Sequence, residues 1–250
     1  MSSEHHGGAA AGANVGRQGC SRARAHSYIR ESQLKPEMTL DDLKREARDF
    51  ALRESAYHEP SLFGVTDGKA VGTYFEHKFQ AYLHTKYLYE EGSSAKGMDF
   101  PELLVDMKVT SLRQPQSSCP FKSARQKIYG LGYSLLVFVY DKTDDPAART
   151  GNLSITATVY VESARTADFQ TTTGLQKIIE NSGNVDDIIA FFQDRFLPVD
   201  DATALELAEE ILAAPPGVGY LTISNALQWR LQYRRVIEKA GQVDGVVKVL

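Results

Sequence analysis

The chain contains the stretch Lys96-Gly97-Met98-Asp99-Phe100-Pro101-Glu102-Leu103-Leu104-Val105-Asp106-Met107-Lys108-Val109-Thr110-Ser111, in which charged side chains interrupt an apolar segment. Residues 103–110 alternate in polarity after a proline, which predicts a β-strand. Asp106 and Lys108 would leave this strand on the same face, because successive side chains point to opposite sides. Burying a carboxylate and an ammonium among apolar residues is unfavourable unless they have a partner, so the pair indicates a functional site.

A second acid, Asp99, lies seven residues before Asp106. A continuous strand would separate the two by about 23 Å, at roughly 3.3 Å per residue. Pro101 and Glu102 are favourable turn residues, however, and a chain reversal there would return Asp99 beside Leu104, on the face of Asp106. Two carboxylates could then hold one cation next to the lysine, and either Asp99 or Glu102 could be the first ligand.

A third acid is expected on the preceding helix, predicted over residues 71–89. Glu76 lies at the edge of the apolar stripe formed by Phe75, Phe79 and Leu83, which is an unusual position for a surface charge. The helix leads directly to the Asp99 segment, so Glu76 can reach the same cation.

Three acids and a lysine are the groups that metal-assisted phosphodiester hydrolysis requires. Carboxylate oxygens suit Mg²⁺, which keeps several waters and accepts phosphate oxygens. The ion polarises the phosphate and lowers the pKa of a bound water, while the lysine orients that water and offsets developing charge. The alternative interpretation is a surface ion pair of Asp106 with Lys108 on an edge strand, with Asp99 in an ordinary turn.

These residues resemble the PD-(D/E)xK nucleases, and specifically the type II restriction endonucleases. The resemblance covers about residues 72–140: a helix with an acid, a turn with Asp99, a strand with Asp106-Met107-Lys108, a helix, and the apolar strand 134–140. Met98 stands where the family has a proline before its first acid. The resemblance implies a single α/β restriction-endonuclease-like domain, with a central mixed β-sheet flanked by helices.

The resemblance also implies an activity and a site. The activity is Mg²⁺-dependent, sequence-specific hydrolysis of double-stranded DNA by a homodimer in the prokaryotic cytoplasm, paired with a cognate DNA methyltransferase. The implied catalytic residues are Glu76, Asp99, Asp106 and Lys108, and the implied metal-binding residues are Asp99, Asp106, Glu76 and Met107. Two alternatives are a repair or anti-phage nuclease that recognises DNA structure, and an inactive DNA-binding module of the same fold.

The DNA-binding surface is predicted after the catalytic strand, because residues 107–140 contain no acid. Arginine and glutamine side chains read base edges, whereas serine and lysine suit phosphates. The predicted contacts are Arg113, Gln114, Gln116, Ser117, Ser118, Lys122, Arg125, Gln126 and Lys127. The alternative is a solvated connecting loop. Residues 180–210 are strongly acidic and are expected to face away from DNA.

The remaining elements are predicted from their patterns. Thr39 caps a helix that ends near Tyr57, and the strands 134–140 and 153–161 surround a turn. Helices are expected at about 168–181, 184–197, 201–213 and 222–240, which form a C-terminal helical part. The last carries Arg230, Arg234, Arg235 and Lys239, and either contacts phosphates or is an ordinary amphipathic surface helix.

Composition sets the limits of these interpretations. The 250 residues carry 28 Lys and Arg against 32 Asp and Glu, a net charge of -4, so a protein that coats nucleic acid is disfavoured. No apolar run is long enough for a membrane span, and two cysteines are too few for a disulfide framework. Residues 1–35 are predicted to be a basic arm, either disordered or lying along DNA, before an endonuclease domain at 36–250.

Overall fold

The computed structural model describes residues 35–92, 97–118, 123–224 and 229–250. The chain divides between Pro36 and Glu37, and the fold is that of the unit Glu37–Leu250. Apart from Lys35, the predicted basic arm lies outside the described residues.

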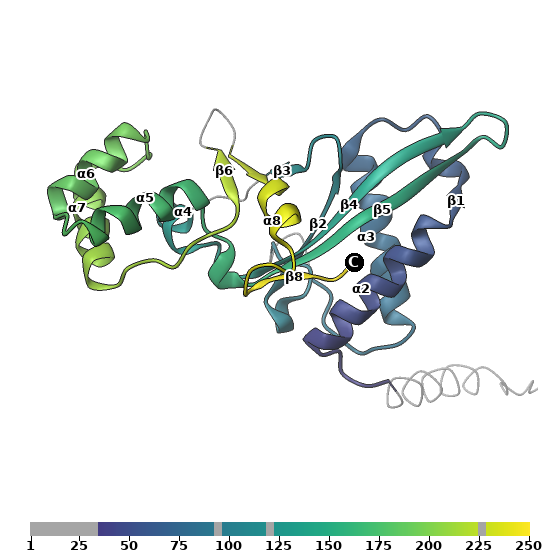
Figure 1. The fold of residues 1–250 in the computed structure, drawn as a ribbon. Coiled ribbons are helices and arrows are strands. Elements are labelled where there is room, and N and C mark those ends of the chain that lie inside the picture. Colours follow the sequence, from purple (N-terminus) through teal and green to yellow (C-terminus); the bar gives the residue numbers. More distant parts are fainter. Residues whose placement is uncertain (1–34, 93–96, 119–122, 225–228) are drawn as a thin grey trace, which may run out of the picture. The chain divides into compact units, whose positions relative to one another are not determined.

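The fold is built on a mixed β-sheet, as predicted (Figure 1). Its path is β1 (His58–Glu59), β5 (Thr150–Val161), β4 (Ser134–Asp145) and β2 (Val105–Ser111), and β8 (Val246–Lys248) also pairs with β5. Only β2 and β4 are parallel, with Val105 opposite Ser134 and Ser111 opposite Tyr140. The strand with Asp106 and Lys108 therefore lies at an end of the sheet path and has one side available to other elements.

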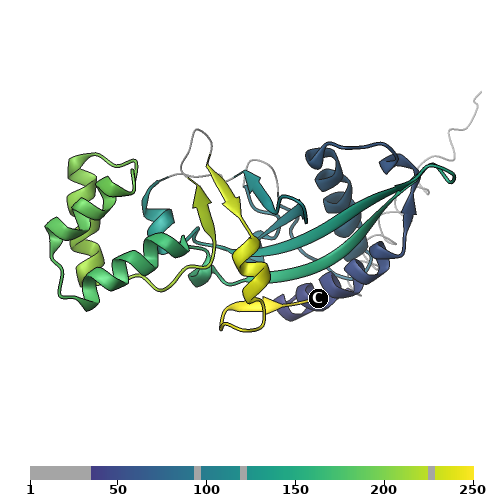
Figure 2. The ribbon, with the colours of Figure 1, turned by 45° about the horizontal axis from the view of Figure 1, so that its top comes forward.

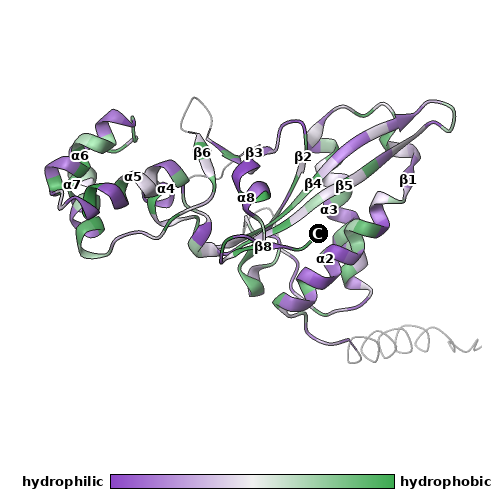
Figure 3. Cartoon of the chain, in the orientation of Figure 1, coloured by the Kyte–Doolittle hydropathy of each residue, from purple (hydrophilic) through white to green (hydrophobic). Residues whose placement is uncertain are grey.

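Strand β4 shows why the run 134–140 is apolar throughout. Leu136, Phe138 and Tyr140 belong to the core on one face of the sheet. The intervening Leu135, Val137 and Val139 belong to the core on the other face. The strand is buried to Tyr140 and exposed from Thr143 to its end, where Figure 3 shows hydrophilic colours.

Two long helices contribute the first core. Helix α2 (Leu40–Ser55) packs on β5, and α3 (Gly68–His84) packs on β2 (Figure 2). Thr39 caps α2 in a reciprocal capping box with Asp42, which confirms the predicted start. Phe50 of α2 meets Phe75 and Phe79 of α3 with ring centroids 5.2 and 5.0 Å apart. The 3-10 turn Pro60–Leu62 connects β1 towards α3.

The second core lies under a small sheet, and here one prediction is wrong. Residues 222–240 are not one helix: they form β6 (Thr222–Ser224), β7 (Arg230–Gln232) and only a short helix, α8 (Arg234–Lys239). Strand β7 lies between β6 and β3 (Gln116–Ser118), so Arg230 is on a strand and is separate from Arg234 and Arg235. Three-residue strands are too short for their alternation to stand out from helical spacing.

The other C-terminal helices are confirmed. They are α5 (Phe169–Glu180), α6 (Val185–Asp194) and α7 (Asp201–Ala213), which follow the 3-10 turn Ser163–Arg165. They share a core with α4 (Arg125–Tyr129), the short helix before β4. Among the described residues, no helix combines the length and apolar character needed to cross a bilayer.

Candidate active site

The acid and the lysine of β2 lie together as predicted. The Asp106 carboxylate is buried, with 3 % of the residue exposed. The Lys108 ammonium is half-buried and lies 2.7 Å from Asp106 Oδ2. A surface ion pair is therefore excluded for this acid, because its carboxylate is removed from bulk solvent.

The predicted chain reversal brings Asp99 back to β2. The 3-10 turn Pro101–Leu103 makes the reversal, and Leu104 completes it in the left-handed region at φ 52°. Phe100 and Val105 then exchange two backbone hydrogen bonds of 3.0 and 3.1 Å. As a result, Asp99 Oδ2 accepts a 2.7 Å hydrogen bond from the Met107 N–H. This pairing places Asp99 opposite Asp106, two residues further along β2 than the expected position beside Leu104.

The alternative ligand, Glu102, is directed elsewhere. Its side chain accepts a 3.1 Å hydrogen bond from the Glu90 backbone N–H and is exposed. The structure thus brings Asp99, and not Glu102, to Asp106.

Glu76 on α3 completes a group of three carboxyl side chains. Asp99 lies close enough to both Glu76 and Asp106 to raise their pKa values. Burial and, after it, the negative charge of Asp99 raise the pKa of Glu76 to about 7. Burial also raises the pKa of Asp106 to about 7, even though Lys108 opposes the shift. Like charges that are buried side by side disfavour ionisation, so a cation or protons must balance these three carboxyl side chains.

A divalent cation fits this group by charge and by donor type. When all three carboxylates are ionised, one lysine leaves two negative charges unbalanced. Asp106 Oδ2 is buried and, despite the nearby ammonium, has no properly oriented hydrogen bond. Among the described residues, no group of three or more His, Cys, Asp or Glu side chains has the geometry to hold a metal ion. Mg²⁺ needs only one or two protein carboxylates, because water and phosphate oxygens complete its shell.

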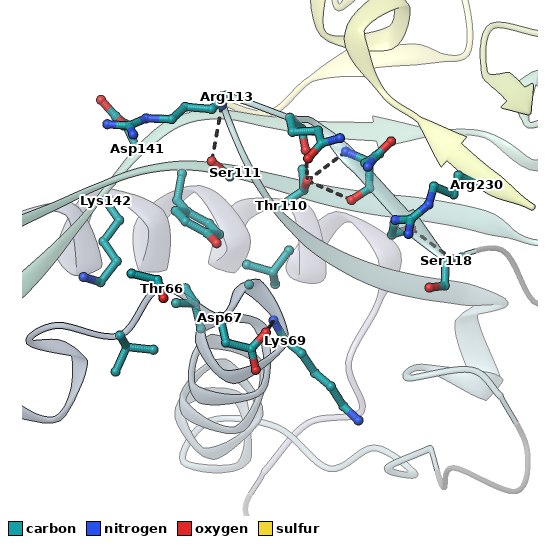
Figure 4. A pocket seen from close by; sticks show the side chains of 18 of the residues that line it. Thr66, Asp67, Lys69, Thr110, Ser111, Arg113, Ser118, Asp141, Lys142 and Arg230 are labelled. Atoms are coloured by element: carbon teal, nitrogen blue, oxygen red, sulfur yellow. Dashed lines mark hydrogen bonds between the residues drawn. The ribbon is translucent and has the colours of Figure 1, made fainter. Parts of the chain in front are cut away.

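Two adjoining hollows lie beside the three acids, and Glu76 lines the smaller one. A cleft of about 280 Å³ is lined by Glu76, Lys108 and Met107, together with Lys69 and Thr73 of α3. A larger groove of about 850 Å³ continues from it and shares Gly68, Lys69 and Val109 as lining residues (Figure 4). Most of the residues that line this groove are polar, and Glu76, Asp99 and Asp106 are not among them.

Five of the predicted DNA contacts line this groove: Arg113, Gln114, Gln116, Ser117 and Ser118. Thr110, at the end of the strand with Asp106, holds their loop. Its hydroxyl accepts a 3.0 Å hydrogen bond from the Gln116 N–H and lies 3.3 Å from the Gln114 carbonyl, to which it donates. The loop is thereby attached directly to β2.

The other predicted contacts lie elsewhere. Arg125 is paired with Glu210 of α7, with its Nε 3.1 Å from the carboxylate, and so it contacts the acidic region that was expected to be remote from it. Lys127 is buried, and burial lowers its pKa. Its ammonium lies over the Trp229 ring, 5.8 Å from the centroid. The Gln126 amide donates to the Leu131 carbonyl at 3.4 Å. These positions do not support phosphate contacts by Arg125 or Lys127, and Lys122 lies outside the described residues.

Sequence reasoning missed several groove residues. Lys69 and Thr73, which line the cleft, stand on α3 about two turns and one turn before Glu76, and their helical spacing from that acid could have indicated them. Lys142 lies at the exposed part of β4 and pairs with Asp144. Arg230 reaches the groove only because β7 pairs with β3, which no local pattern reveals.

A mixed sheet flanked by helices carries Asp106 and Lys108 on a strand at the end of its path, with Asp99 and Glu76 brought beside that strand by a turn and by α3. This is the arrangement of a restriction-endonuclease-type nuclease. The model of the family "Type II restriction enzyme NspV" matches residues 37–248. The type II restriction enzyme NspV of a Nostoc species is 62% identical over 212 residues, which are 85% of this chain and 96% of that protein. The chain therefore belongs to the NspV family of type II restriction enzymes, which are site-specific endonucleases that act on DNA and generally use a divalent metal ion. No solved structure matches the chain.

Proposed function

We propose that the chain hydrolyses phosphodiester bonds of double-stranded DNA with Mg²⁺, and that Glu76, Asp99, Asp106 and Lys108 form its catalytic site. The observation that supports this assignment is the buried Asp106 carboxylate between Asp99 and Lys108. A structural ion pair would have no need of a further acid, Asp99, that raises the pKa of Asp106.

Each side chain has a distinct role in this proposal. Asp106 and Asp99 bind the cation, Asp99 being fixed by the Met107 N–H, and Glu76 contributes from α3. Mg²⁺ would polarise the phosphate and lower the pKa of a water. Lys108 orients the attacking water and stabilises the negative charge that develops on the phosphate oxygens. A direct part for Met107 in the metal site stays a prediction.

DNA occupies the groove next to the cleft in this proposal. Arg113, Gln114, Gln116 and Ser118 contact it from the loop after β2, and Lys69 and Thr73 approach the phosphates nearest Glu76. Ser117, also predicted as a contact, has its hydroxyl bonded to the Tyr233 hydroxyl instead. A homodimer would bring two such sites to the two strands of a symmetric sequence. We further propose that the enzyme works with a methyltransferase that protects the same sequence in the prokaryotic cytoplasm.

The direct test is cleavage of a supercoiled plasmid in Mg²⁺. The wild-type protein should give discrete fragments, and Asp106→Asn and Lys108→Ala should each lose at least about a hundredfold in rate, as for loss of one charge-stabilising group. Both variants should still bind the plasmid.

Asp41→Asn is the matched control, because Asp41 is an acid on α2 whose side chain is 90% exposed in a surface ion pair. It should cut at the wild-type rate. A smear of fragments from the wild type, or cleavage by Asp106→Asn within about tenfold of the wild type, a barrier change of roughly 1.4 kcal/mol, would contradict the proposal.

A further inference from the structure

The small sheet β3-β7-β6 presents a completely polar face. In an antiparallel pair, residues opposite each other share a face, and neighbours along a strand take opposite faces. The register places Gln116, Gln232 and Thr222 in one row across the three strands, and Ser118, Arg230 and Ser224 in another. Both rows lie on one face, because their members are two residues apart.

The row between them holds the sheet in place. It consists of Ser117, Leu231 and Ile223. Leu231 and Ile223 are buried, and they pack in the same core as β4. The Ser117 hydroxyl is hydrogen-bonded to the Tyr233 hydroxyl. Since this row points inward, the two polar rows point outward, where their residues are half-buried or exposed.

The polar face adjoins the groove beside the catalytic cleft. Gln116, Ser118 and Arg230 all line that groove, and Figure 4 shows Arg230 and Ser118 together at one side of it. Thr110 connects the same sheet to β2 through the Gln116 N–H. A duplex that lies in the groove and extends into the adjoining cleft would thus meet Glu76, Lys108 and this face at the same time.

The chemistry of the face matches the edges of base pairs. Arginine makes two hydrogen bonds to guanine, glutamine makes two to adenine, and serine or threonine can bond to any base. A two-stranded β-ribbon fits the major groove of DNA, and neighbouring strands are about 4.8 Å apart. A phosphate-binding surface would need several cations. The two outward rows contain one cation, Arg230, and five residues with hydroxyl or amide side chains.

We propose that the outward face of β3-β7-β6 reads the recognition sequence in the major groove, with Arg230 bound to a guanine and Gln232 and Gln116 bound to neighbouring bases. This inference rests on the proposed function, because it requires DNA in the groove next to Asp106. It assigns sequence discrimination to β6 and β7 as well as to the loop after β2.

The test measures discrimination, not activity alone. The wild-type protein is first used to cut a library of randomised duplexes in Mg²⁺, and sequencing of the cut ends defines the site. Cleavage rates are then measured on that site and on each of its single-base-pair substitutions. Arg230→Ala should lose between about fivefold and a hundredfold of the discrimination at one symmetric pair of positions and keep it elsewhere. Arg230→Lys should not restore it, because lysine lacks the planar pair of donors.

Arg234→Ala is the matched control, since it removes the same charge from the exposed surface of α8, outside the two rows. Its discrimination profile should equal that of the wild type. Gln232→Ala, at an exposed strand end, provides a second test that does not depend on the folding of Arg230→Ala, and it should relax a different position.

Wild-type profiles for both Arg230→Ala and Gln232→Ala, or rates lowered equally on every sequence, would overturn this inference alone. A wild-type protein that leaves the library uncut, or an Asp106→Asn variant that still cuts it, would instead overturn the proposed function.

Discussion

Buried acids occur in two regions of this molecule, on α2 and on β2, and their pKa values shift in opposite directions. Between α2 and α3, Glu46 is 4 % exposed and accepts hydrogen bonds from Tyr82, Tyr87 and Lys86 at 2.6, 2.9 and 2.6 Å. Burial alone would raise its pKa, but the bonds from Lys86 and the two tyrosines lower the pKa below its ordinary value. On β2, burial and the neighbouring Asp99 raise the pKa of Asp106 to about 7, although Lys108 opposes the shift.

The difference lies in what surrounds each carboxylate. Glu54, the second buried acid of α2, is also satisfied, by the Tyr74 hydroxyl at 2.7 Å and the Lys78 ammonium at 2.9 Å. Asp106 and Glu76 instead face Asp99, another acid. Burial by itself therefore does not mark a functional acid in this fold. An acid that is buried against other acids marks a functional site in this fold, because only a bound cation or protons can balance the negative charges.

The first prediction concerns the hydrogen bonds around the buried Glu46. Glu46→Gln keeps the shape of the side chain but removes the charge that two tyrosines and Lys86 bind. We expect the free energy of unfolding to fall by about 1–3 kcal/mol, which lowers Tm by roughly 2–12 °C in a chain of this length. Calorimetry measures this, and plasmid cleavage well below Tm should stay at the wild-type rate.

Asp41→Asn on the same helix serves as its control, because a surface ion pair contributes little. An equal loss in both variants, or a loss of cleavage in Glu46→Gln at low temperature, would remove the distinction between the two regions.

The second prediction concerns how the stability contributions of Asp106 and Glu46 depend on pH. A carboxyl group whose pKa is higher in the folded state than in the unfolded state destabilises the fold once it ionises, so the stability falls as pH rises from about 4 to about 7. In metal-free buffer, Asp106→Asn should therefore be more stable than the wild type at pH 8, by on the order of 1 kcal/mol, and similar to it near pH 4. The pKa of Glu46 is lowered, so its contribution has the opposite sign and is lost as pH falls below about 4.5.

Thermal unfolding in a chelator at several pH values checks this difference. If Asp106→Asn were less stable than the wild type at pH 8, Asp106 would be a satisfied structural acid like Glu46.

The sequence predicted the parts of the site that depend on local chemistry. Asp106 and Lys108 share a face by strand alternation, and Pro101 placed the reversal that returns Asp99. The two-faced burial of β4 followed from its unbroken apolar run. In each case the signal lies within about ten residues of chain.

The parts that could not be predicted depend on distant pairings. Arg230 reaches the groove through a register with Ser118, more than a hundred residues away. Arg125 looked like a DNA contact because its neighbours in sequence are polar and basic, but Glu210 of α7 pairs with it. Lys127 was misplaced for a similar reason, since only the packing of α4 shows that its side chain is buried. No local pattern contains the partner in any of these cases.

The central claim is that Glu76, Asp99 and Asp106 form a divalent cation site. Calorimetric titration of Mg²⁺ into the metal-free protein tests it most directly. At pH 6.5, buffers with different ionisation enthalpies report whether protons leave on binding. The account predicts that the wild type and Asp41→Asn bind Mg²⁺ and release protons, because pKa values of about 7 at Glu76 and Asp106 leave protons for the ion to displace. Asp106→Asn should not show this binding. Equal Mg²⁺ binding by Asp106→Asn and the wild type would contradict the account.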